Sequence, residues 1–346
     1  TNPCGDTIVE VATEVEGDIP EGAAVRFTIL DETIGVASVA CAVRDGIGKA
    51  AIPLAAPKRW SHLRPFLYRM RIELLLPDGA DIEDESIGVR TRRDGTANPV
   101  AVRTPCDETV IPFGVRHVTF DADRGFLLDG ERIKLRGVCL HHDGGCVGAA
   151  VPEAVWHRRL LKLKEMGCNA IRMSHNPPDP ALLDLCDRLG FHVMDEAFDE
   201  WRIRKAKNGR SDHGYGDLWE ENHLQDFTDM IRRDRNHPSI ILWSIGNEIP
   251  EQTVPGGDLP ARELVALCHR LDPTRLAVSA CDNIQAEPRP ATDAFLEALD
   301  VVGGNYINRW RHRTELFYAE ERHAHPNWRL IGSEHGAVGG FRARYE

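Results

Sequence analysis

The sequence predicts an all-β domain followed by an α/β domain built on a parallel sheet. The length of 346 residues allows about two domains, at roughly 100–200 residues per domain. In the first third of the chain, apolar and polar side chains alternate with a period of two, which is typical of half-buried strands. After about residue 116, short apolar runs alternate with helical stretches, which is typical of repeated strand–helix units.

We expect the first domain, residues 1–116, to be a small antiparallel β-sandwich. Apolar side chains occupy alternate positions in residues 25–29 and again in residues 68–74. Proline and glycine residues separate these runs, as turns between short strands do. Residues 92–112 are polar and irregular, so we place the domain boundary just after them.

We expect the second domain, residues 117–346, to alternate strands with helices. The candidate strands are seven apolar runs, residues 134–138, 170–173, 191–195, 240–245, 276–279, 300–305 and 329–333. The candidate helices are a segment after Pro152, a segment that ends at Gly190, and residues 217–235, 261–271 and 314–323. Pro152 suits the first turn of a helix, and Gly190 suits a carboxyl-terminal cap.

Repeated strand–helix units fit either a (β/α)8 TIM barrel or an open doubly wound sheet. No G-x-G-x-x-G sequence opens the first crossover helix, which disfavours a dinucleotide-binding sheet. Polar residues cluster at the carboxyl ends of the strands, where TIM barrels have their active sites. The barrel is therefore favoured. Because the chain ends shortly after Glu334, we expect a TIM barrel that is truncated after its seventh strand.

The composition excludes several classes of partner. The chain has 42 Lys and Arg against 54 Asp and Glu, a net charge of −12, so we expect no nucleic-acid partner and no anionic membrane partner. No apolar run approaches the roughly 20 residues of a membrane helix. The nine cysteines include no C-x-x-C pair, which favours reduced thiols over a disulfide framework or a zinc site. We therefore expect a cytoplasmic protein, with a secreted or periplasmic location left open.

Two glutamates follow apolar strands at the expected carboxyl-terminal edge. Residues 242–248 end in Asn247 and Glu248, and residues 330–334 end in Glu334. Two carboxyl groups at one end of a barrel are what glycoside hydrolysis requires, one to protonate the leaving oxygen and one to attack or stabilise the anomeric carbon. The alternative is that both glutamates are ordinary polar strand ends.

Further polar and aromatic residues lie at other strand ends. Each has a structural alternative: Arg172 pairs with a buried acid, Trp201 is a rim aromatic rather than a platform for a sugar, and Tyr306 only packs. Asp195 is interpreted as a structural acid in a salt bridge at the barrel rim. The candidate substrate-binding residues are His141, Arg172, His175, Asn176, Asn247, Trp201 and Tyr306.

A metal site is a weaker interpretation. His141 and Asp143 follow the first predicted strand, and His175 is a further candidate ligand. A metallohydrolase barrel requires additional histidines on later strands, where this sequence has glutamates instead. Neither a G-x-S-x-G motif nor a P-loop is present. We therefore predict no metal and no cofactor.

Taken together, these segments resemble glycoside hydrolase family 2, especially its β-galactosidases. Residues 60–61 and 65–68 also resemble the immunoglobulin-like domain of that family. The segments of the second domain that resemble the family are residues 125–130, 135–138, 141–143, 169–177, 194–196, 243–248 and 333–336. The resemblance implies an immunoglobulin-like β-sandwich followed by the TIM barrel.

The resemblance also implies a retaining, exo-acting β-glycosidase that forms a glycosyl-enzyme intermediate on a carbohydrate substrate. Glu248 matches the general acid/base and Glu334 the nucleophile. Asn247 matches the residue that binds the sugar 2-hydroxyl, and other strand-end residues match the pocket around the sugar. The leading substrate is a β-galactoside. β-Glucuronidase and β-mannosidase activity, or an inactive carbohydrate-binding fragment, stay open.

The sequence also departs from the family. We expect the amino-terminal sugar-binding sandwich and the last barrel strand to be missing, and the full-length parent to be a possible homo-oligomer. Some relatives hold magnesium through a glutamate and a histidine two residues later. Glu200 fits that glutamate, but Arg202 stands in place of the histidine, and a cation there opposes metal binding.

Overall fold

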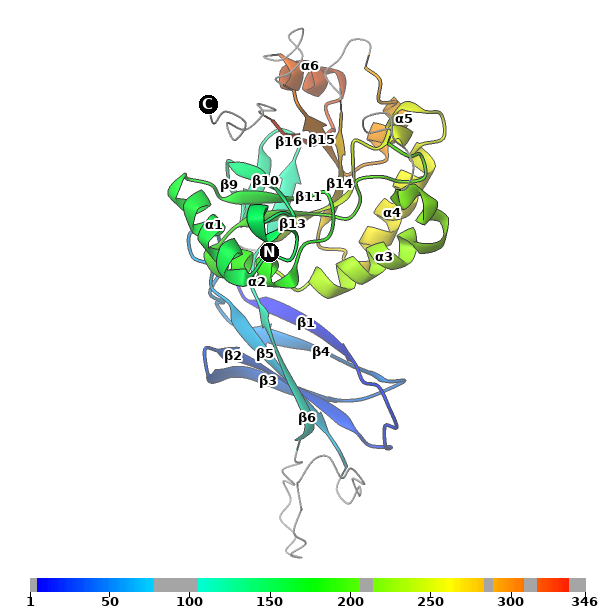
Figure 1. Ribbon diagram of the computed structural model, residues 1–346. Helices are drawn as coiled ribbons and strands as arrows, with labels where there is room; N and C mark the ends of the chain where they lie inside the picture. Colours follow the sequence, from blue (N-terminus) through cyan, green and yellow to red (C-terminus); the bar gives the residue numbers. More distant parts are fainter. Residues whose placement is uncertain (1–4, 78–104, 206–213, 283–288, 308–315, 336–346) are drawn as a thin grey trace, which may run out of the picture. The chain divides into compact units, whose positions relative to one another are not determined.

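The computed structural model describes residues 5–77, 105–205, 214–282, 289–307 and 316–335. The chain divides into two compact units, each described separately below (Figure 1). The first unit comprises Thr1–Lys58 and Leu67–Val115, and the second comprises Arg59–Phe66 and Arg116–Glu346. The segment Arg59–Phe66 therefore belongs to the second unit, which the predicted division of the sequence does not anticipate.

Within its described residues, the first unit contains two antiparallel sheets, as the period-two alternation predicts. One sheet pairs β1 with β4, and the other has the order β3-β2-β5-β6. Its strands are β1 (Thr7–Glu14), β2 (Ala24–Asp31), β3 (Ile34–Ala42), β4 (Ile47–Leu54), β5 (Tyr68–Leu75) and β6 (Pro105–Phe113). The expectation that residues 92–112 are irregular is wrong from residue 105 on, because residues 105–113 form a strand. The more specific immunoglobulin-like assignment stays a prediction.

The burial pattern of β5 differs from the prediction at its carboxyl-terminal half. Ile72 is only half-buried, whereas Glu73 is buried. The carboxylate of Glu73 accepts hydrogen bonds of 2.8 and 3.0 Å from Arg26 on the neighbouring strand. An ion pair across the two strands therefore replaces the apolar contact that simple alternation predicts.

The described part of the second unit is built on a parallel sheet of seven strands. Its order, β10-β11-β12-β13-β14-β15-β16, follows the chain, which is the arrangement of successive strands in a TIM barrel. Within the described residues, β10 and β16 are the two edges of this sheet. Its strands are β10 (Gly137–His141), β11 (Ala170–Ser174), β12 (His192–Glu196), β13 (Ile240–Asn247), β14 (Leu276–Cys281), β15 (Val301–Asn305) and β16 (Leu330–Glu334).

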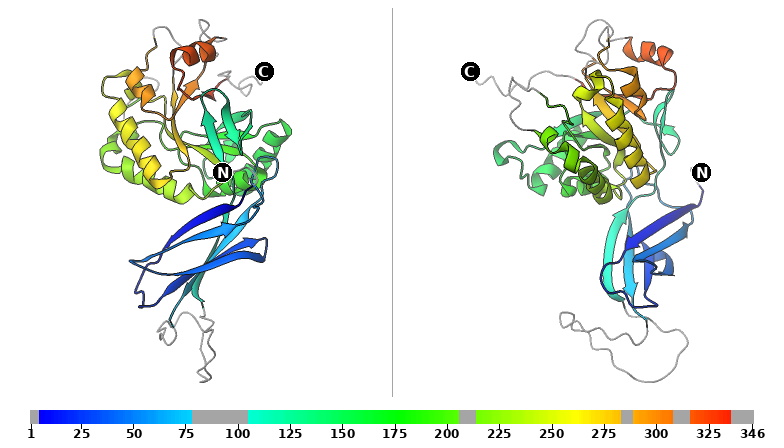
Figure 2. Two further views of the ribbon diagram at one scale, coloured as in Figure 1. Left: turned by 180° about the vertical axis from the view of Figure 1, so that it is seen from behind. Right: turned by 90° about the vertical axis from the view of Figure 1, so that its right-hand side faces the viewer.

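The helices of the second unit surround this sheet, as Figures 1 and 2 show. They are α1 (Glu153–Glu165), α2 (Pro180–Leu189), α3 (Trp219–Asp234), α4 (Asp258–Leu271), α5 (Asp293–Glu297) and α6 (Phe317–Ala324), with 3-10 turns η1 (Gly145–Val147), η2 (Tyr215–Asp217) and η3 (Pro250–Thr253). In the described part of the chain, none has the length and hydropathy of a membrane-spanning segment.

The first barrel strand begins three residues later than predicted, which corrects the expected range 134–138. The side chain of Asn169 explains the shift. Its Nδ2 donates to the carbonyl of Lys134 at 3.0 Å, and its Oδ1 accepts from the amide of Arg136 at 2.8 Å. These side-chain hydrogen bonds occupy backbone groups that a ladder would otherwise use, so the parallel pairing starts at Gly137.

Two apolar clusters fill the second unit, one outside the sheet and one inside it. The outer cluster packs helix residues such as Leu160 and Phe227 against the sheet. The inner cluster joins strand residues such as Leu242 to Phe120 and Phe126. These phenylalanines come from the hairpin of β7 (Val118–Asp121) and β8 (Gly125–Leu128), which pairs with the short β9 (Glu131–Arg132). Because apolar side chains fill the inner cluster, the polar side chains of these strands lie at the carboxyl ends instead.

Candidate active site

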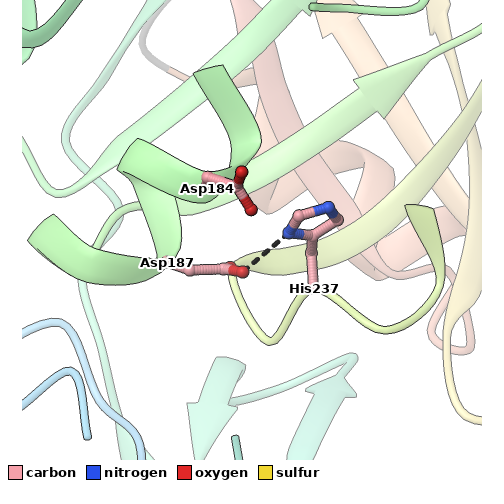
Figure 3. A group of neighbouring side chains, drawn as sticks. All are labelled: Asp184, Asp187 and His237. Carbon is pink, nitrogen blue, oxygen red and sulfur yellow. Dashed lines mark hydrogen bonds and ion pairs between the residues drawn. The ribbon is translucent and has the colours of Figure 1, made fainter. Parts of the chain in front are cut away.

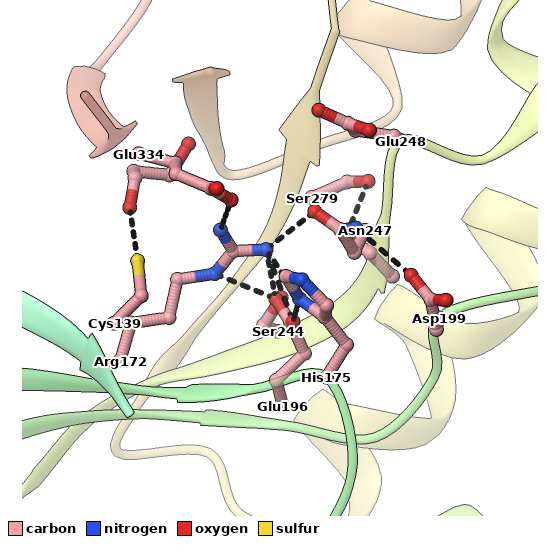
Figure 4. A network of polar contacts seen from close by, with 12 residues as sticks. Cys139, Arg172, His175, Glu196, Asp199, Ser244, Asn247, Glu248, Ser279 and Glu334 are labelled. Carbon is pink, nitrogen blue, oxygen red and sulfur yellow. Dashed lines mark hydrogen bonds and ion pairs between the residues drawn. The ribbon is translucent and has the colours of Figure 1, made fainter. Parts of the chain in front are cut away.

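The carboxyl ends of the parallel strands bring together polar side chains that are far apart in the sequence. Strands β11, β12, β13, β15 and β16 each contribute at least one of them, and Figure 4 shows how those from β11, β12, β13 and β16 face one another. The central residues are Arg172, Glu196, Asn247, Glu248, Asn305, Tyr306 and Glu334. Parallel strands all end at the same edge, so a polar residue at each end reaches one shared site.

A buried ion pair forms the floor of this site. Arg172 donates from Nε to Glu196 Oε2 at 3.0 Å and from Nη2 to Oε2 at 2.8 Å. Glu196 also accepts from Ser244 Oγ at 2.7 Å and lies 2.7 Å from His175 Nδ1. Burial alone would raise the pKa of Glu196, but the charge of Arg172 and the hydrogen bonds of His175 and Ser244 outweigh it and lower that pKa.

The same guanidinium faces the glutamate predicted as the nucleophile. Arg172 Nη1 donates to Glu334 Oε2 at 3.0 Å, and the Tyr306 hydroxyl donates to Glu334 Oε1 at 2.6 Å. The backbone amide of Tyr306 also donates to the carbonyl of Glu334 at 2.6 Å. Both oxygens of this carboxylate thus have a donor, one of them cationic, which suits a group that must act as an anion.

The second glutamate, Glu248, follows the end of β13 in a left-handed backbone conformation, with φ of 46°. Its amide donates to the carbonyl of Ala280 at 2.7 Å, which fixes this turn of the chain. Asn305 Nδ2 lies 3.1 Å from Glu248 Oε1 and 3.5 Å from Glu334 Oε2. Because both distances are measured from the same nitrogen, their sum is the largest possible separation of Glu248 Oε1 and Glu334 Oε2.

Asn247 connects the ion pair to the loop after β12. Its Oδ1 accepts from Arg172 Nη2 at 2.7 Å, and its Nδ2 donates to Asp199 Oδ1 at 2.9 Å. Lys205 Nζ donates to the same Asp199 oxygen at 2.8 Å and to the carbonyl of Asn247 at 2.5 Å. The amide side chain that precedes Glu248 is thus held from both sides.

The remaining predicted substrate-binding residues are placed differently. His141 and Asn176 are exposed, and the ring of His141 lies 5.0 Å from that of His175. Trp201 is a correction: its side chain is 0% exposed, so it has no free face for a sugar. Its Nε1 donates to the carbonyl of Ile245 at 2.8 Å, and the residue packs in the core under the loop after β12.

Sequence reasoning missed several residues of this network. Asn305 and Glu196 are the most important, followed by Ser244, Ser333, Asp199 and Lys205. The strand period contains a signal for Glu196, because it lies two positions after Met194, which faces the inner cluster. Its neighbour Asp195 points to the opposite face of the sheet.

Asp195 also corrects the expected salt bridge at the barrel rim. It is fully buried, and neither of its carboxylate oxygens has a hydrogen-bond partner within the described ranges. Burial, and then the nearby carboxylate of Asp234, raise the pKa of Asp195 well above its usual value. Asp234 is the residue that pairs with Arg233, at 2.6 Å.

The residues considered for metal binding do not form such a site. Where the structure describes the chain, the potential ligand atoms of His141, Asp143 and His175 do not gather at one point. Glu200 accepts from the backbone amides of Gly216 and Lys205, both at 2.8 Å, so its two oxygens already have partners.

One other group of potential ligands lies at the carboxyl-terminal end of α2. It consists of Asp184, Asp187 and His237 (Figure 3). Asp187 Oδ2 lies 2.7 Å from His237 Nδ1, and Asp187 Oδ1 accepts from the amide of Ser239 at 2.9 Å. These contacts are those of a structural carboxylate–histidine pair.

The sequence matches a known family over most of the second unit. Residues 121–329 match the family described as glycosyl hydrolases family 2, TIM barrel domain. The chain is 43% identical over 235 residues to the β-galactosidase BoGH2A of Bacteroides ovatus, covering 59% of this chain and 27% of that enzyme. It is 38% identical over 227 residues to a putative β-glucuronidase of Formosa agariphila, covering 66% of this chain and 18% of that protein.

Solved structures agree with these sequence matches. A glycosyl hydrolase family 2 member from Bacteroides cellulosilyticus is similar with a TM-score of 0.77 and 32% identity, over 96% of this chain and 39% of that chain. A β-glucuronidase from Bacteroides uniformis is similar with a TM-score of 0.75 and 25% identity, over 97% of this chain and 39% of that chain. The chain therefore spans less than half the length of each of these relatives.

Proposed function

This chain belongs to glycoside hydrolase family 2, and on that premise we propose that it provides the catalytic glutamates of a retaining, exo-acting β-glycosidase. In this proposal Glu334 is the nucleophile and Glu248 is the general acid/base. The observation that supports it most directly is the contact of both carboxylates with the single amide nitrogen of Asn305.

The spacing of the two glutamates supports double displacement. Retaining glycosidases place their two carboxyl groups about 5–5.5 Å apart, whereas inverting enzymes leave room for a water between them. The upper limit that Asn305 sets on the separation of Glu248 Oε1 and Glu334 Oε2 allows the retaining distance. A direct attack by Glu334 on the anomeric carbon is thus the reaction that fits this geometry.

The reaction proceeds in two balanced steps. Glu334 forms a bond to the anomeric carbon while the glycosidic bond breaks, and the proton of Glu248 goes to the departing oxygen. Glu248 then takes a proton from water, the resulting oxygen attacks the anomeric carbon, and the bond to Glu334 breaks. Both substitutions invert the carbon, so the configuration is retained overall.

The residues around the glutamates have supporting roles in this proposal. Arg172 and Tyr306 hold the carboxylate of Glu334 at the position required for attack, because each donates to a different oxygen. Asn247, held by Asp199, is proposed to bind the sugar next to the reacting carbon. His141, His175 and Asn176 are proposed to bind other hydroxyl groups of the sugar.

The proposed substrate is a terminal β-galactoside. BoGH2A, the relative with 43% identity, is named a β-galactosidase. A second candidate is a β-glucuronide, because a relative with 38% identity and a similar solved structure are named β-glucuronidases. Hydrolysis of nitrophenyl β-galactoside and nitrophenyl β-glucuronide by the full-length protein distinguishes the two candidates, since only the preferred sugar gives a high kcat/KM.

Covalent labelling tests the assignment of the nucleophile. Incubation of the full-length protein with a 2-deoxy-2-fluoro glycoside of the preferred sugar is expected to add one sugar to Glu334, because the fluorine slows the second step more than the departure of a good leaving group. Peptide mass analysis identifies the labelled residue. A label on Glu200, or on any residue other than Glu334, would reject the assignment.

Azide rescue tests the assignment of the acid/base. Replacing Glu248 with alanine is expected to lower kcat about 10²–10⁴-fold, the usual contribution of proton transfer. Azide needs no base, so it should restore turnover of an activated substrate and yield a β-glycosyl azide. Failure of azide to restore turnover, or an α-glycosyl azide product, would contradict the proposed roles.

A further inference from the structure

The side chain of Asn305 occupies a central position between the two glutamates. It is the last residue of β15 and is 0% exposed. Its Nδ2 lies 3.1 Å from Glu248 Oε1, 3.1 Å from Asn247 Oδ1 and 3.5 Å from Glu334 Oε2. One buried nitrogen thus faces three oxygen acceptors, two of which belong to the proposed catalytic carboxyls.

The orientation of this amide follows from its other contact. Ser333 Oγ donates to Asn305 Oδ1 at 2.7 Å, so the oxygen faces β16 and the nitrogen faces the acceptors. The opposite orientation would direct Asn305 Oδ1 at both carboxylates. It would also direct it at Asn247 Oδ1, which already accepts from Arg172. Neither the ionised carboxylate of Glu334 nor Asn247 Oδ1 has a proton to donate, so the opposite orientation is unfavourable in this buried position.

The number of protons on this nitrogen limits what it can bind at one time. A side-chain amide has two N–H groups, whereas three acceptors lie within hydrogen-bond range. With one N–H directed at Asn247, the other must serve either Glu248 or Glu334. In the proposed reaction, negative charge leaves Glu334 as it bonds to the sugar and appears on Glu248 as it releases its proton.

We propose that Asn305 is a positioning residue whose free N–H moves from Glu334 to Glu248 as the negative charge moves between them. The inference rests on the proposed function and adds a residue that couples its two carboxyl groups. Because Ser333 precedes Glu334 in β16, the strand that presents the nucleophile also fixes the amide. The hydrogen bond therefore follows the charge without any movement of the backbone.

The charged and titratable groups around this amide come from several elements. They are Arg172 on β11, His175 after β11, Glu196 on β12, Asp199 and Lys205 after β12, Glu248 after β13, Tyr306 after β15 and Glu334 on β16. Replacing Asn305 alone leaves all of these groups in the sequence, so the lost N–H is the direct chemical change to which a shift in pH dependence is compared.

The test is the pH profile of kcat/KM for the full-length protein, measured with the nitrophenyl glycoside of the preferred sugar. In the proposed mechanism, the acid limb reports ionisation of the nucleophile and the alkaline limb reports loss of the proton of the acid. Asn305→Ala is expected to lower kcat/KM about 10²-fold, as loss of a preorganised donor does. It is also expected to move the acid limb to higher pH, because ionised Glu334 loses a donor that favours its charged form. The alkaline limb should move less, because the same N–H already serves Glu334 when Glu248 ionises.

Two further variants keep the test decisive. Asn305→Asp preserves the shape and the acceptor for Ser333 but places a negative charge between the glutamates, so both limbs should move still farther to higher pH. Ser279→Ala is the matched control, because Ser279 is also buried on the adjacent strand and its hydroxyl donates to the carbonyl of Gly246 at 3.1 Å. Both limbs of the pH profile of Ser279→Ala should coincide with those of the wild type.

The outcomes separate this inference from the function on which it rests. If the wild type labels at Glu334 but the limbs of both Asn305 variants stay unmoved, Asn305 is only structural and the inference is wrong. If Asn305→Ala does not fold, as judged by circular dichroism, the Asn305→Asp profile decides. If the wild type hydrolyses no glycoside and takes no label, the proposed function itself fails.

Discussion

At the scale of the residue, Arg172 determines the geometry of the site. Its guanidinium contacts Glu196, Glu334 and Asn247, all at 3.0 Å or less. A planar group with five donors in a fixed fork can meet three acceptors at once, whereas an ammonium is a point charge. Glu334 is therefore positioned by a residue that is itself held by the fully buried carboxylate of Glu196.

The first prediction concerns this fork. Arg172→Lys is expected to lower kcat/KM at least about 10²-fold, since a misplacement of about 1 Å costs that much. It should also lower the melting temperature, because Glu196 loses its bidentate partner in a buried site. Kinetics and thermal unfolding measure the two effects.

Arg188→Lys is the matched control for that change. Arg188 pairs with Glu153 at 3.0 Å, but both side chains are more than half exposed. Such surface pairs contribute about 0–1 kcal/mol, so neither quantity should change appreciably. Wild-type kcat/KM in Arg172→Lys would show that one positive charge suffices and would refute the argument from the fork.

The sequence predicts some residues of this site and not others, for physical reasons. Glu248 and Glu334 each follow an apolar strand, so their position at the barrel edge is readable from the pattern. Asn305 is equally at a strand end, but its importance depends on the side chains opposite it, which no local pattern contains. Trp201 follows a strand too, yet a tryptophan in a loop packs inward or outward according to tertiary contacts alone.

At the scale of the element, the strands are the most predictable feature because burial on both faces gives continuous apolar runs. Strand β13 illustrates this, since all its residues are buried. The first barrel strand was misplaced because Asn169 satisfies backbone groups of the preceding segment. The short helix α5, whose cap is Thr292, was missed because five residues are too few to show a helical period.

The second prediction concerns the end of α2. Gly190 has φ of 72°, and its amide donates to the carbonyl of Cys186. A Cβ at this position would lie 2.7 Å from the carbonyl oxygen of His62, which is a backbone atom and cannot rotate away. Gly190→Ala is therefore expected to destabilise the fold by more than the roughly 1–2 kcal/mol that a left-handed residue alone costs.

Gly167, at the end of α1, provides the matched control. It has φ of 85°, but a Cβ there would meet no atom within 4 Å. Gly167→Ala should thus cost only the conformational part, roughly 1–2 kcal/mol. Denaturant unfolding gives both free energies by linear extrapolation. Equal losses in the two variants would mean that the contact with His62 adds nothing.

At the scale of the whole molecule, two separate units are predictable because the hydrophobic period changes from two to that of strand–helix units. The assignment of Arg59–Phe66 to the second unit is not predictable from the sequence, because no local pattern in this segment indicates where it packs. Its Trp60 donates from Nε1 to the carbonyl of Asp187 at 2.9 Å, and its His62 ring lies 5.2 Å from that of His192. This segment therefore places His62 next to the buried His192.

The third prediction is that this pair makes stability depend on pH. His192 is 0% exposed, and neither ring nitrogen has a hydrogen-bond partner in the described part of the chain. Burial, together with the charges of His62, Arg116 and Lys164, lowers the pKa of His192 well below its usual value. Burial also lowers the pKa of His62.

The sign of the effect follows from these directions. A group with a lowered pKa binds fewer protons in the folded state than in the unfolded chain, so stability is lost as the pH falls below about 6.5. His237 works in the opposite direction. Although burial opposes it, Asp187 raises the pKa of His237, so that contribution is complete below about pH 6.5 and is lost at higher pH.

Replacing His192 tests this account. His192→Phe puts an aromatic ring where Phe126 and Trp60 already lie within 5.0 and 5.6 Å. It also removes two buried nitrogens that have no hydrogen-bond partner among the described residues. The unfolding free energy should rise at pH 5 and should fall less steeply between pH 6.5 and pH 5. The maximal change in slope is about 1.4 kcal/mol per pH unit for one histidine.

Denaturant unfolding at several pH values measures the slope of the unfolding free energy against pH. The exposed His157 on α1 supplies the control, since His157→Gln should leave this slope unchanged. A His192→Phe slope equal to that of the wild type would show that another group titrates in this range, because most carboxylates titrate below it.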